Sequence, residues 1–323
     1  IGTALGPSLG GVLIAALGWQ AIFLINVPLG FLAFILAYRH LPVDRPVPTA
    51  DRTGFDTMGT LLLALTLGAY ALAMTTGRGS FGSLNMNLLL AAAFGVVLFV
   101  FAERRAASPL LRLAMFRVSV LSASLATSAL VATVMMATLV VGPFYLSRAL
   151  QLDAAFVGLA MSIGPIISAL SGMLAGRSVD RWGAPLMVSV GLIAMAAGSV
   201  ALSVLPTMSG IAGYIVAIAV LTPGYALFQA ANNTAVMMDV QPDQRGVMSG
   251  LLNLSRNLGL ITGASLMGAV FALASAATDI TTASPDAIAS GMRITFAVAG
   301  VLIVMALAIA VGSRARAIRP LRH

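Results

Sequence analysis

Few side chains in this sequence could carry out chemistry. The 323 residues include 18 basic and 10 acidic residues, two histidines and no cysteine. His40 stands in a loop and His323 ends the chain, so no spacing is typical of a metal site, and the lack of cysteine excludes disulfides and thiolate ligands. The phosphate-binding pattern GxxxxGK[ST] is also missing. We therefore predict no catalysis, no metal, no cofactor and no use of ATP by this chain.

One charged residue lies deep inside an apolar run. Arg256 follows Arg245 by about eleven residues, which is roughly 16 Å along an α-helix and close to the centre of a ~30 Å hydrocarbon core. An arginine there costs about 2.5–3.5 kcal/mol on insertion scales, so it should face protein or water. Asn253 and Asn257 are its polar neighbours. Arg256 is either a structural residue bonded to helix carbonyls or reaching the membrane surface, or a cavity residue that repels protons and cationic compounds until an acid pairs with it.

Three further polar residues, Gln229, Asn232 and Asn233, lie close together near the end of another apolar run. They are either pocket residues or part of a capped helix end, and the sequence does not separate these alternatives. No apolar run carries an acid near its centre.

The composition indicates a protein dissolved in lipid. Hydrophobic residues make up 59% of the chain, charged residues only 9%, and the mean hydropathy is +1.01. A soluble domain carries about 25% charged residues. The net charge of +8 is typical of nucleic-acid binding proteins, but here every basic residue is an arginine placed between apolar runs. Such a distribution follows the positive-inside bias of membrane proteins, and we predict no nucleic-acid partner.

The apolar runs predict an all-α, polytopic transmembrane bundle of about ten helices, because one span needs about 20 residues. Residues 1–38 carry no charge and are too long for one span, so they are expected to turn near Gly18 and Trp19. A second long uncharged stretch, 182–238, is expected to be divided near Pro206. Residues 1–38 would thus supply two spans. The remaining eight, which include the two halves of 182–238, are 57–77, 84–102, 119–147, 154–175, 184–205, 210–231, 245–273 and 292–313.

The arginines orient these spans. One set of connections holds 14 arginines and the opposite set holds three, which places the first set and the C-terminus in the cytoplasm. An even number of spans puts residue 1 on the same side. The chain opens on Ile1 inside an apolar run, and we interpret it as part of a longer protein. The larger set is Arg39, Arg45, Arg52, Arg104, Arg105, Arg112, Arg117, Arg177, Arg181, Arg245, Arg314, Arg316, Arg319 and Arg322; the smaller is Arg78, Arg148 and Arg293.

Charge and proline divide the chain into segments. Residues 39–56 and 103–118 have the composition of linkers, and an isolated pair of spans, 57–77 and 84–102, lies between them. Together they form an expected segment 39–118. Residues 119–313 contain six spans with short connections, and 314–323 form a basic tail.

Two motifs have spacings that predict more than simple spans. Gly2, Gly6 and Gly10 recur every four residues, followed by Gly11, and would leave one helix face bare for close packing. Pro7 within this run adds a kink, which favours a specialised element over a plain packing face.

The second motif, residues 176–183, contains Gly176, Asp180, Arg181 and Gly183. We expect a loop between two helix ends. It is either a solvated turn or a cytoplasmic gate, in which Asp180 near a helix N-terminus bridges helices in one conformation of the protein and releases them in another.

These motifs resemble those of a known family. The run GTALGPSLGG at 2–11 resembles the antiporter signature on the fifth helix of drug:proton antiporters of the major facilitator superfamily. Residues 19–30 resemble the fourteen-helix EmrB/QacA-type branch, which has arginine where this chain has Gln20. Phe55, Asp56 and Gly59 are similar to the start of that branch's extra helix pair, and residues 176–183 to the superfamily's G-x-x-x-D-R-x-G motif.

The resemblance implies a fold and a function. The chain would be helices five to fourteen: 1–38 would be the last two helices of an N-terminal bundle, and 119–313 a six-helix C-terminal bundle. It would export drugs or amphiphilic small molecules across the cell membrane by proton antiport. The four missing helices would carry the key ionisable groups, so the fragment would not transport alone. The alternatives are an exporter of an endogenous metabolite or self-made antibiotic, and a non-transporting scaffold or sensor.

Overall fold

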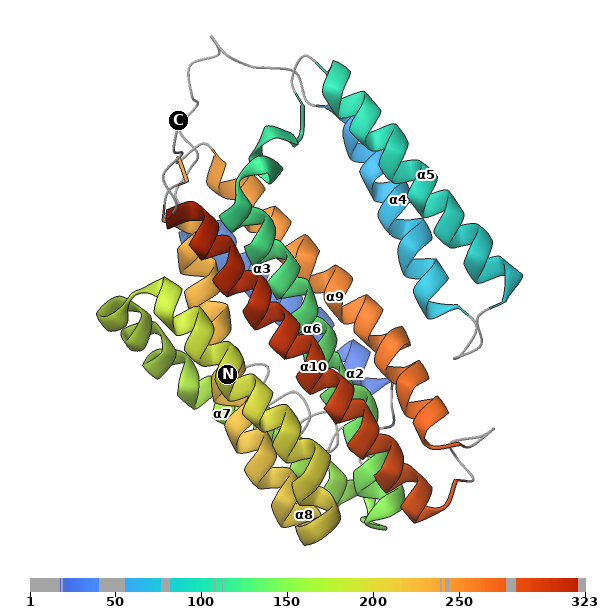
Figure 1. Ribbon diagram of the computed structural model, residues 1–323. Coiled ribbons are helices and arrows are strands. Elements are labelled where there is room, and N and C mark those ends of the chain that lie inside the picture. Colours follow the sequence, from blue (N-terminus) through green and yellow to red (C-terminus); the bar gives the residue numbers. More distant parts are fainter. Residues whose placement is uncertain are drawn as a thin grey trace.

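The computed structural model describes residues 18, 20–40, 56–76, 82–106, 109–111, 113–238, 240–241, 244–276 and 283–318. Every regular element among them is helical, so the predicted all-α architecture is confirmed (Figure 1). The glycine motif made of Gly2, Gly6, Pro7, Gly10 and Gly11 lies outside the described residues, as do residues 319–323 of the basic tail.

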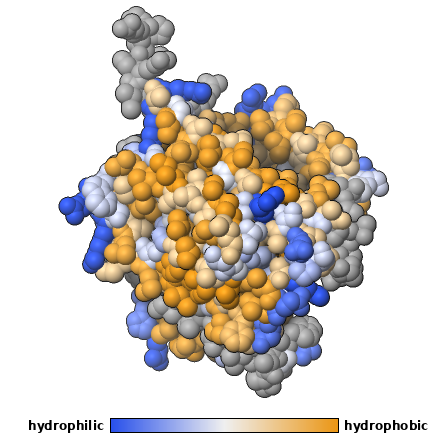
Figure 2. All heavy atoms as spheres, turned by 60° about the horizontal axis from the view of Figure 1, so that its bottom comes forward, coloured by the Kyte–Doolittle hydropathy of each residue, from blue (hydrophilic) through white to orange (hydrophobic). Residues whose placement is uncertain are grey.

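Nine α-helices follow one another along the described residues. Seven of them are long and apolar enough to cross a membrane. Apolar side chains also cover much of the face shown in Figure 2, with hydrophilic ones mostly near its edges. The helices are α2 (Ala21–Leu24), α3 (Asn26–His40), α4 (Thr57–Thr75), α5 (Ser83–Arg105), α6 (Ser119–Phe144), α7 (Ala154–Trp182), α8 (Ala184–Met237), α9 (Arg245–Ala274) and α10 (Pro285–Ile318), with a short 3₁₀-helix, η2 (Leu113–Arg117), and a short π-helix, η3 (Tyr145–Ala149).

The described residues thus contain seven candidate spans rather than the ten predicted. Two of the three missing spans were expected within 1–38, where residues 1–17 are not described and α3 has only 15 residues. The third is contained in α8, whose 54 residues include both predicted spans 184–205 and 210–231. One of the three spans is therefore missing from the count only because α8 contains two predicted spans.

Helix α8 is in fact a helical hairpin. Gly210 has φ 55°, a left-handed conformation that glycine adopts without strain, and the helical geometry breaks there. Gly198 then packs on the backbone of Leu221, and Gly191 on the backbone of Phe228, so residues before and after Gly210 run antiparallel. The turn comes four residues after Pro206, which instead lies buried and accepts a hydrogen bond from the Tyr145 hydroxyl at 2.8 Å.

A close crossing joins α6 and α9. A Cβ added to Gly259 would lie 2.8 Å from the Cβ of Ala132, and one added to Gly263 would lie 2.6 Å from the carbonyl oxygen of Thr133. The Thr133 hydroxyl donates to the Gly259 carbonyl at 3.0 Å. Two glycines four residues apart thus let the two backbones touch, which is the small-xxx-small packing mode of membrane helices.

The α4–α5 pair is attached to the rest of the helices through α9 (Figure 1). The Tyr70 hydroxyl lies 2.5 Å from the Thr262 hydroxyl, and the Ser265 hydroxyl donates to the carbonyl of Met74. At one end of the pair, Phe99 and Leu111 belong to an apolar cluster that also holds Leu251 of α9. Most of the remaining surface of the pair is exposed, as expected for helices that face lipid.

Candidate functional site

Four of the six predicted polar residues line one pocket, which we call the Arg256 pocket. Its volume is about 160 Å³, and its walls come from α6, the second half of α8, and α9. Gln229 and Asn233 face Asn253 and Arg256 across it. The pocket is lined by Ser128, Gln229, Asn233, Met237, Ser249, Leu252, Asn253 and Arg256.

Helical spacing places these side chains. Asn253 and Arg256 are three residues apart on α9, and Gln229 and Asn233 are four apart on α8, so each pair shares one helix face. The α9 face is fixed against α6 by Ser255, whose hydroxyl donates to the Leu125 carbonyl at 2.5 Å. The glycine crossing at Gly259 lies one turn further along the same helix.

The pocket's chemistry is polar and cationic. The Arg256 guanidinium offers five N–H donors, and Asn253 and Asn233 are exposed amides beside it. Gln229 is half-buried, and its amide donates to the Tyr225 hydroxyl at 3.2 Å. None of the described residues that line the pocket is acidic. The arrangement suits a neutral or anionic polar group attached to an apolar body, which Met237 and Leu252 could contact.

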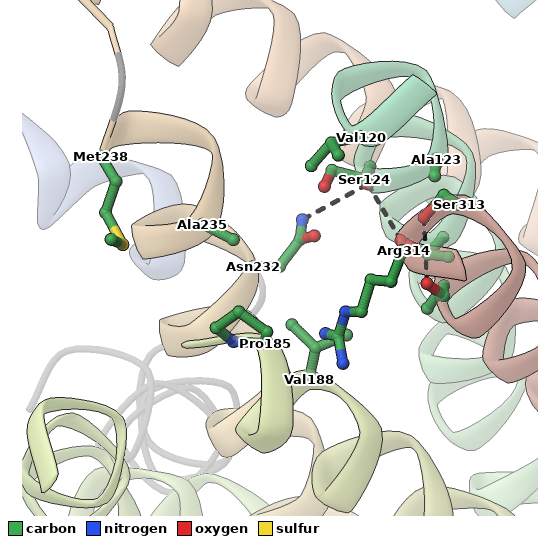
Figure 3. A pocket seen from close by; sticks show the side chains of 12 residues that line it. Val120, Ala123, Ser124, Pro185, Val188, Asn232, Ala235, Met238, Ser313 and Arg314 are labelled. Carbon is green, nitrogen blue, oxygen red and sulfur yellow. Dashed lines mark hydrogen bonds between the residues drawn. The ribbon is translucent and has the colours of Figure 1, made fainter. Parts of the chain in front are cut away.

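Asn232 and Asn257 do not belong to this pocket. Asn257 is exposed on α9, one residue beyond Arg256. Asn232 is buried, at 1% exposure, and turns toward a second cavity of about 200 Å³ between α6, α8 and α10, which we call the Arg314 cavity. There its amide donates to the Ser124 carbonyl at 3.3 Å (Figure 3).

Arg314 is the residue of this second cavity that sequence reasoning missed. Its side chain reaches from α10 toward Pro185 and Val188 of α8 (Figure 3), and its guanidinium donates to the Ser189 hydroxyl at 3.1 Å. The sequence predicted a basic tail beginning at 314. Helix α10 instead continues through Ile318, so this arginine lies on a helix that packs against α8.

The motif at 176–183 is not a loop. Helix α7 continues through Trp182, and only Gly183, with φ 83°, breaks it before α8 starts. Asp180 and Arg181 are exposed, and the Arg181 guanidinium lies 5.3 Å from the Trp182 ring centroid. Neither residue forms an ion pair with another described residue. A charged last turn is compatible with a helix because such a turn can extend beyond the apolar layer.

Asp180 provides a first testable prediction. In the full-length protein, Asp180→Asn is expected to change the balance between conformations open to either side of the membrane, if its carboxylate binds a basic partner in only one of them. Cysteines introduced on the two faces would report the change by their labelling rates, and this chain contributes no cysteine of its own. Asp153→Asn, another exposed helix-end acid, is the matched control. Unchanged labelling on both faces would leave Asp180 with a topological role only.

Comparison with known proteins identifies the family. The sequence profile of the Major Facilitator Superfamily matches residues 1–264 and, in a second alignment, 123–319. The uncharacterized transporter YebQ of Escherichia coli K12 is 31% identical over 83% of this chain and 58% of its own length. The riboflavin transporter RibZ of Clostridioides difficile is 27% identical over 84% of this chain and 58% of its own length.

Two further likenesses add detail. The drug efflux pump JefA of Mycobacterium tuberculosis is 32% identical over 84% of this chain and 53% of its own length. A crystal structure of the nucleoside transporter NupG, in a mutant form, superposes with a TM-score of 0.52 at 17% identity, covering 97% of this chain and 82% of NupG; this likeness concerns the fold alone. The chain spans about half the length of the curated relatives it matches. It belongs to the Major Facilitator Superfamily, and is therefore a multi-pass membrane protein of a transporter family and not an enzyme.

Proposed function

We propose that this chain is the larger part of an exporter that moves drugs or other amphiphilic small molecules across the cell membrane by proton antiport. The observation that carries the proposal is the Arg256 pocket, where polar residues predicted from two separate runs meet, on α8 and α9, with α6 as the third wall. Secondary transporters hold their substrates at such sites near the middle of the bilayer. The names of two relatives also favour export of drugs: JefA, and the multidrug resistance protein Stp of Mycobacterium tuberculosis at 29% identity.

The proposal assigns a place to each segment. Residues 1–38 would close an N-terminal bundle, 119–313 would form the C-terminal bundle, and α4 and α5 would be the extra pair of a fourteen-helix branch. The C-terminus would be cytoplasmic, as the arginine distribution indicates. No described lining residue of the pocket is acidic, and the family resemblance would place the proton-binding acid of an antiporter on helices of the N-terminal bundle.

An exporter of an endogenous metabolite is the second candidate. RibZ is named for riboflavin transport, and it matches this chain as extensively as the drug pumps do. The polar, cationic lining of the Arg256 pocket is compatible with a metabolite that carries an anionic or hydrogen-bonding group. A scaffold or sensor has no comparable support, since such a role needs no polar pocket within the membrane.

The experiment uses the full-length protein in cells that lack their own main efflux pumps. We expect the protein to lower accumulation of some members of a panel of cationic, neutral and anionic dyes, and collapse of the proton gradient to abolish this effect. Export that persists without the gradient would contradict antiport. Failure to export any dye, together with export of riboflavin or another metabolite, would select the second candidate. Chain 1–323 alone should insert without transporting.

A further inference from the structure

Two carboxylates meet where α4 begins and α5 ends. Asp56 caps α4, and its Oδ1 accepts a hydrogen bond from the Gly59 N–H at 2.7 Å. Glu103 belongs to the last turn of α5, is only 4% exposed, and its Oε2 accepts from the Leu111 N–H at 3.2 Å. One carboxylate oxygen of each acid thus accepts a hydrogen bond from a backbone N–H.

The second oxygen of each acid has no partner. Asp56 Oδ2 and Glu103 Oε1 are both buried and, among the described residues, neither receives a hydrogen bond. A Cβ built on Gly59 would lie 2.8 Å from Glu103 Oε1, and closer still to Asp56 Oδ2. The two oxygens therefore lie close to one point, beside a residue that has no side chain.

No described cation compensates the two acids. Helices α4 and α6 carry no charged side chain. On α5, Arg104 is exposed and Arg105 lies over the Phe101 ring at 4.1 Å. On α9, Arg245 is exposed at the start of the helix and Arg256 lines its own pocket. Around Glu103 the packing is apolar, with Phe99 and Leu111 in the cluster shared with α9.

We propose that Asp56 and Glu103 bind one proton between them. Two ionised carboxylates that face each other in an apolar setting repel and are poorly solvated, and such pairs retain a shared proton. Glu103 is the more buried acid, so its carboxyl O–H donates to Asp56 Oδ2. The pair then carries one negative charge, which the N-terminus of α4 stabilises.

This proton acts as a clamp. The shared proton links the first turn of α4 to the last turn of α5. Through Glu103, the same turn of α5 also binds the backbone N–H of Leu111. The inference does not rest on the transport proposal, because neither Asp56 nor Glu103 lines the Arg256 pocket.

Infrared spectroscopy of the full-length protein in lipid vesicles tests the proposal. At neutral pH we expect the difference spectrum, wild type minus Glu103→Gln, to contain the C=O stretching band of a protonated carboxylic acid. The glutamine amide still donates to Asp56, so this variant should remain folded. Asp153→Asn is the matched control, because Asp153 is an exposed cap of α7 with the same kind of hydrogen bond, to the Phe156 N–H at 2.9 Å. It should leave the band unchanged.

Thermal unfolding provides a second measurement with a defined sign. At neutral pH an unfolded chain has released both protons, because free Asp and Glu titrate near ~4. The folded pair holds one proton more, so raising the pH should lower the melting temperature of wild type. Glu103→Gln has no such proton and should lose this dependence. A difference spectrum without this band would overturn the proposal. Alkaline stability restored by sodium or magnesium ions would overturn it in favour of a cation site.

Discussion

Replacing Arg256 by alanine in the full-length protein is expected to lower export at least about tenfold while the protein still inserts normally. Arg256 is the only charged residue that lines the pocket among the described residues, and its guanidinium is the strongest donor there. A tenfold change corresponds to about 1.4 kcal/mol, which is close to the contribution of one hydrogen bond to a charged group. Arg256→Lys should recover part of the activity, because it keeps the charge but loses the planar donor fork.

The measurement is efflux of an established substrate at several external pH values, normalised to the amount of protein in the membrane. Arg245→Ala is the matched control, since Arg245 is exposed on the same helix and lines no described pocket. It should export normally. If Arg256→Ala exports at the wild-type rate with the same pH profile, the pocket has no part in transport or coupling, and the structural interpretation of Arg256 is the correct one.

Gly259→Ala is expected to destabilise the protein by about 1–3 kcal/mol, the usual cost of overpacking. The new methyl group would be forced against the Ala129 carbonyl and the Ala132 Cβ of α6, and both belong to a helix that cannot move without disturbing the core. In an exposed helix the same change would stabilise by about 1 kcal/mol, because alanine favours helix more than glycine does. The sign of the effect therefore reports the close crossing.

Gly268→Ala supplies the control, on the same helix and with the same chemical change. A Cβ at that position meets only Val140 Cγ1 at 3.9 Å, an ordinary contact. Thermal unfolding of the purified full-length variants should show a lower melting temperature for Gly259→Ala and an unchanged or slightly higher one for Gly268→Ala. Equal melting temperatures would mean that α6 and α9 do not touch at Gly259 in the assembled protein.

Hydropathy was sufficient to predict most helices but not where the chain reverses. The predicted span 245–273 and the observed α9, Arg245–Ala274, differ by one residue because a charged residue marks the start. Within α8 no charge marks the turn, and Pro206 was the strongest local signal. The turn instead lies at Gly210, because a buried proline is tolerated in a helix whereas glycine adopts a positive φ without strain. At Asp180 the opposite error occurred: the charged residues were interpreted as a loop, whereas helix α7 continues past them through Trp182.

The site was predictable one helix at a time. The i, i+3 spacing of Asn253 and Arg256 defines a polar face from sequence alone, whereas its meeting with Gln229 and Asn233 depends on how α8 packs beside α9. Asn232 and Asn233 are adjacent, yet successive helical residues point about 100° apart, so they enter different cavities. Glu103 was interpreted as a linker charge because nothing local in the sequence indicates that it is buried against Asp56.

The hairpin of α8 has a consequence for membrane insertion. Its 54 residues contain no charged side chain, so neither half can be oriented by its own flanking charges at Gly210. The charges that orient the hairpin in the membrane lie outside it, at Arg181 before the hairpin and at Arg245 after it. Both halves should therefore leave the insertion machinery together as one unit. An arginine introduced next to Gly210 would add a positive charge at the turn of the hairpin. This charge would favour a cytoplasmic position for the turn, and so oppose the orientation that Arg181 and Arg245 favour.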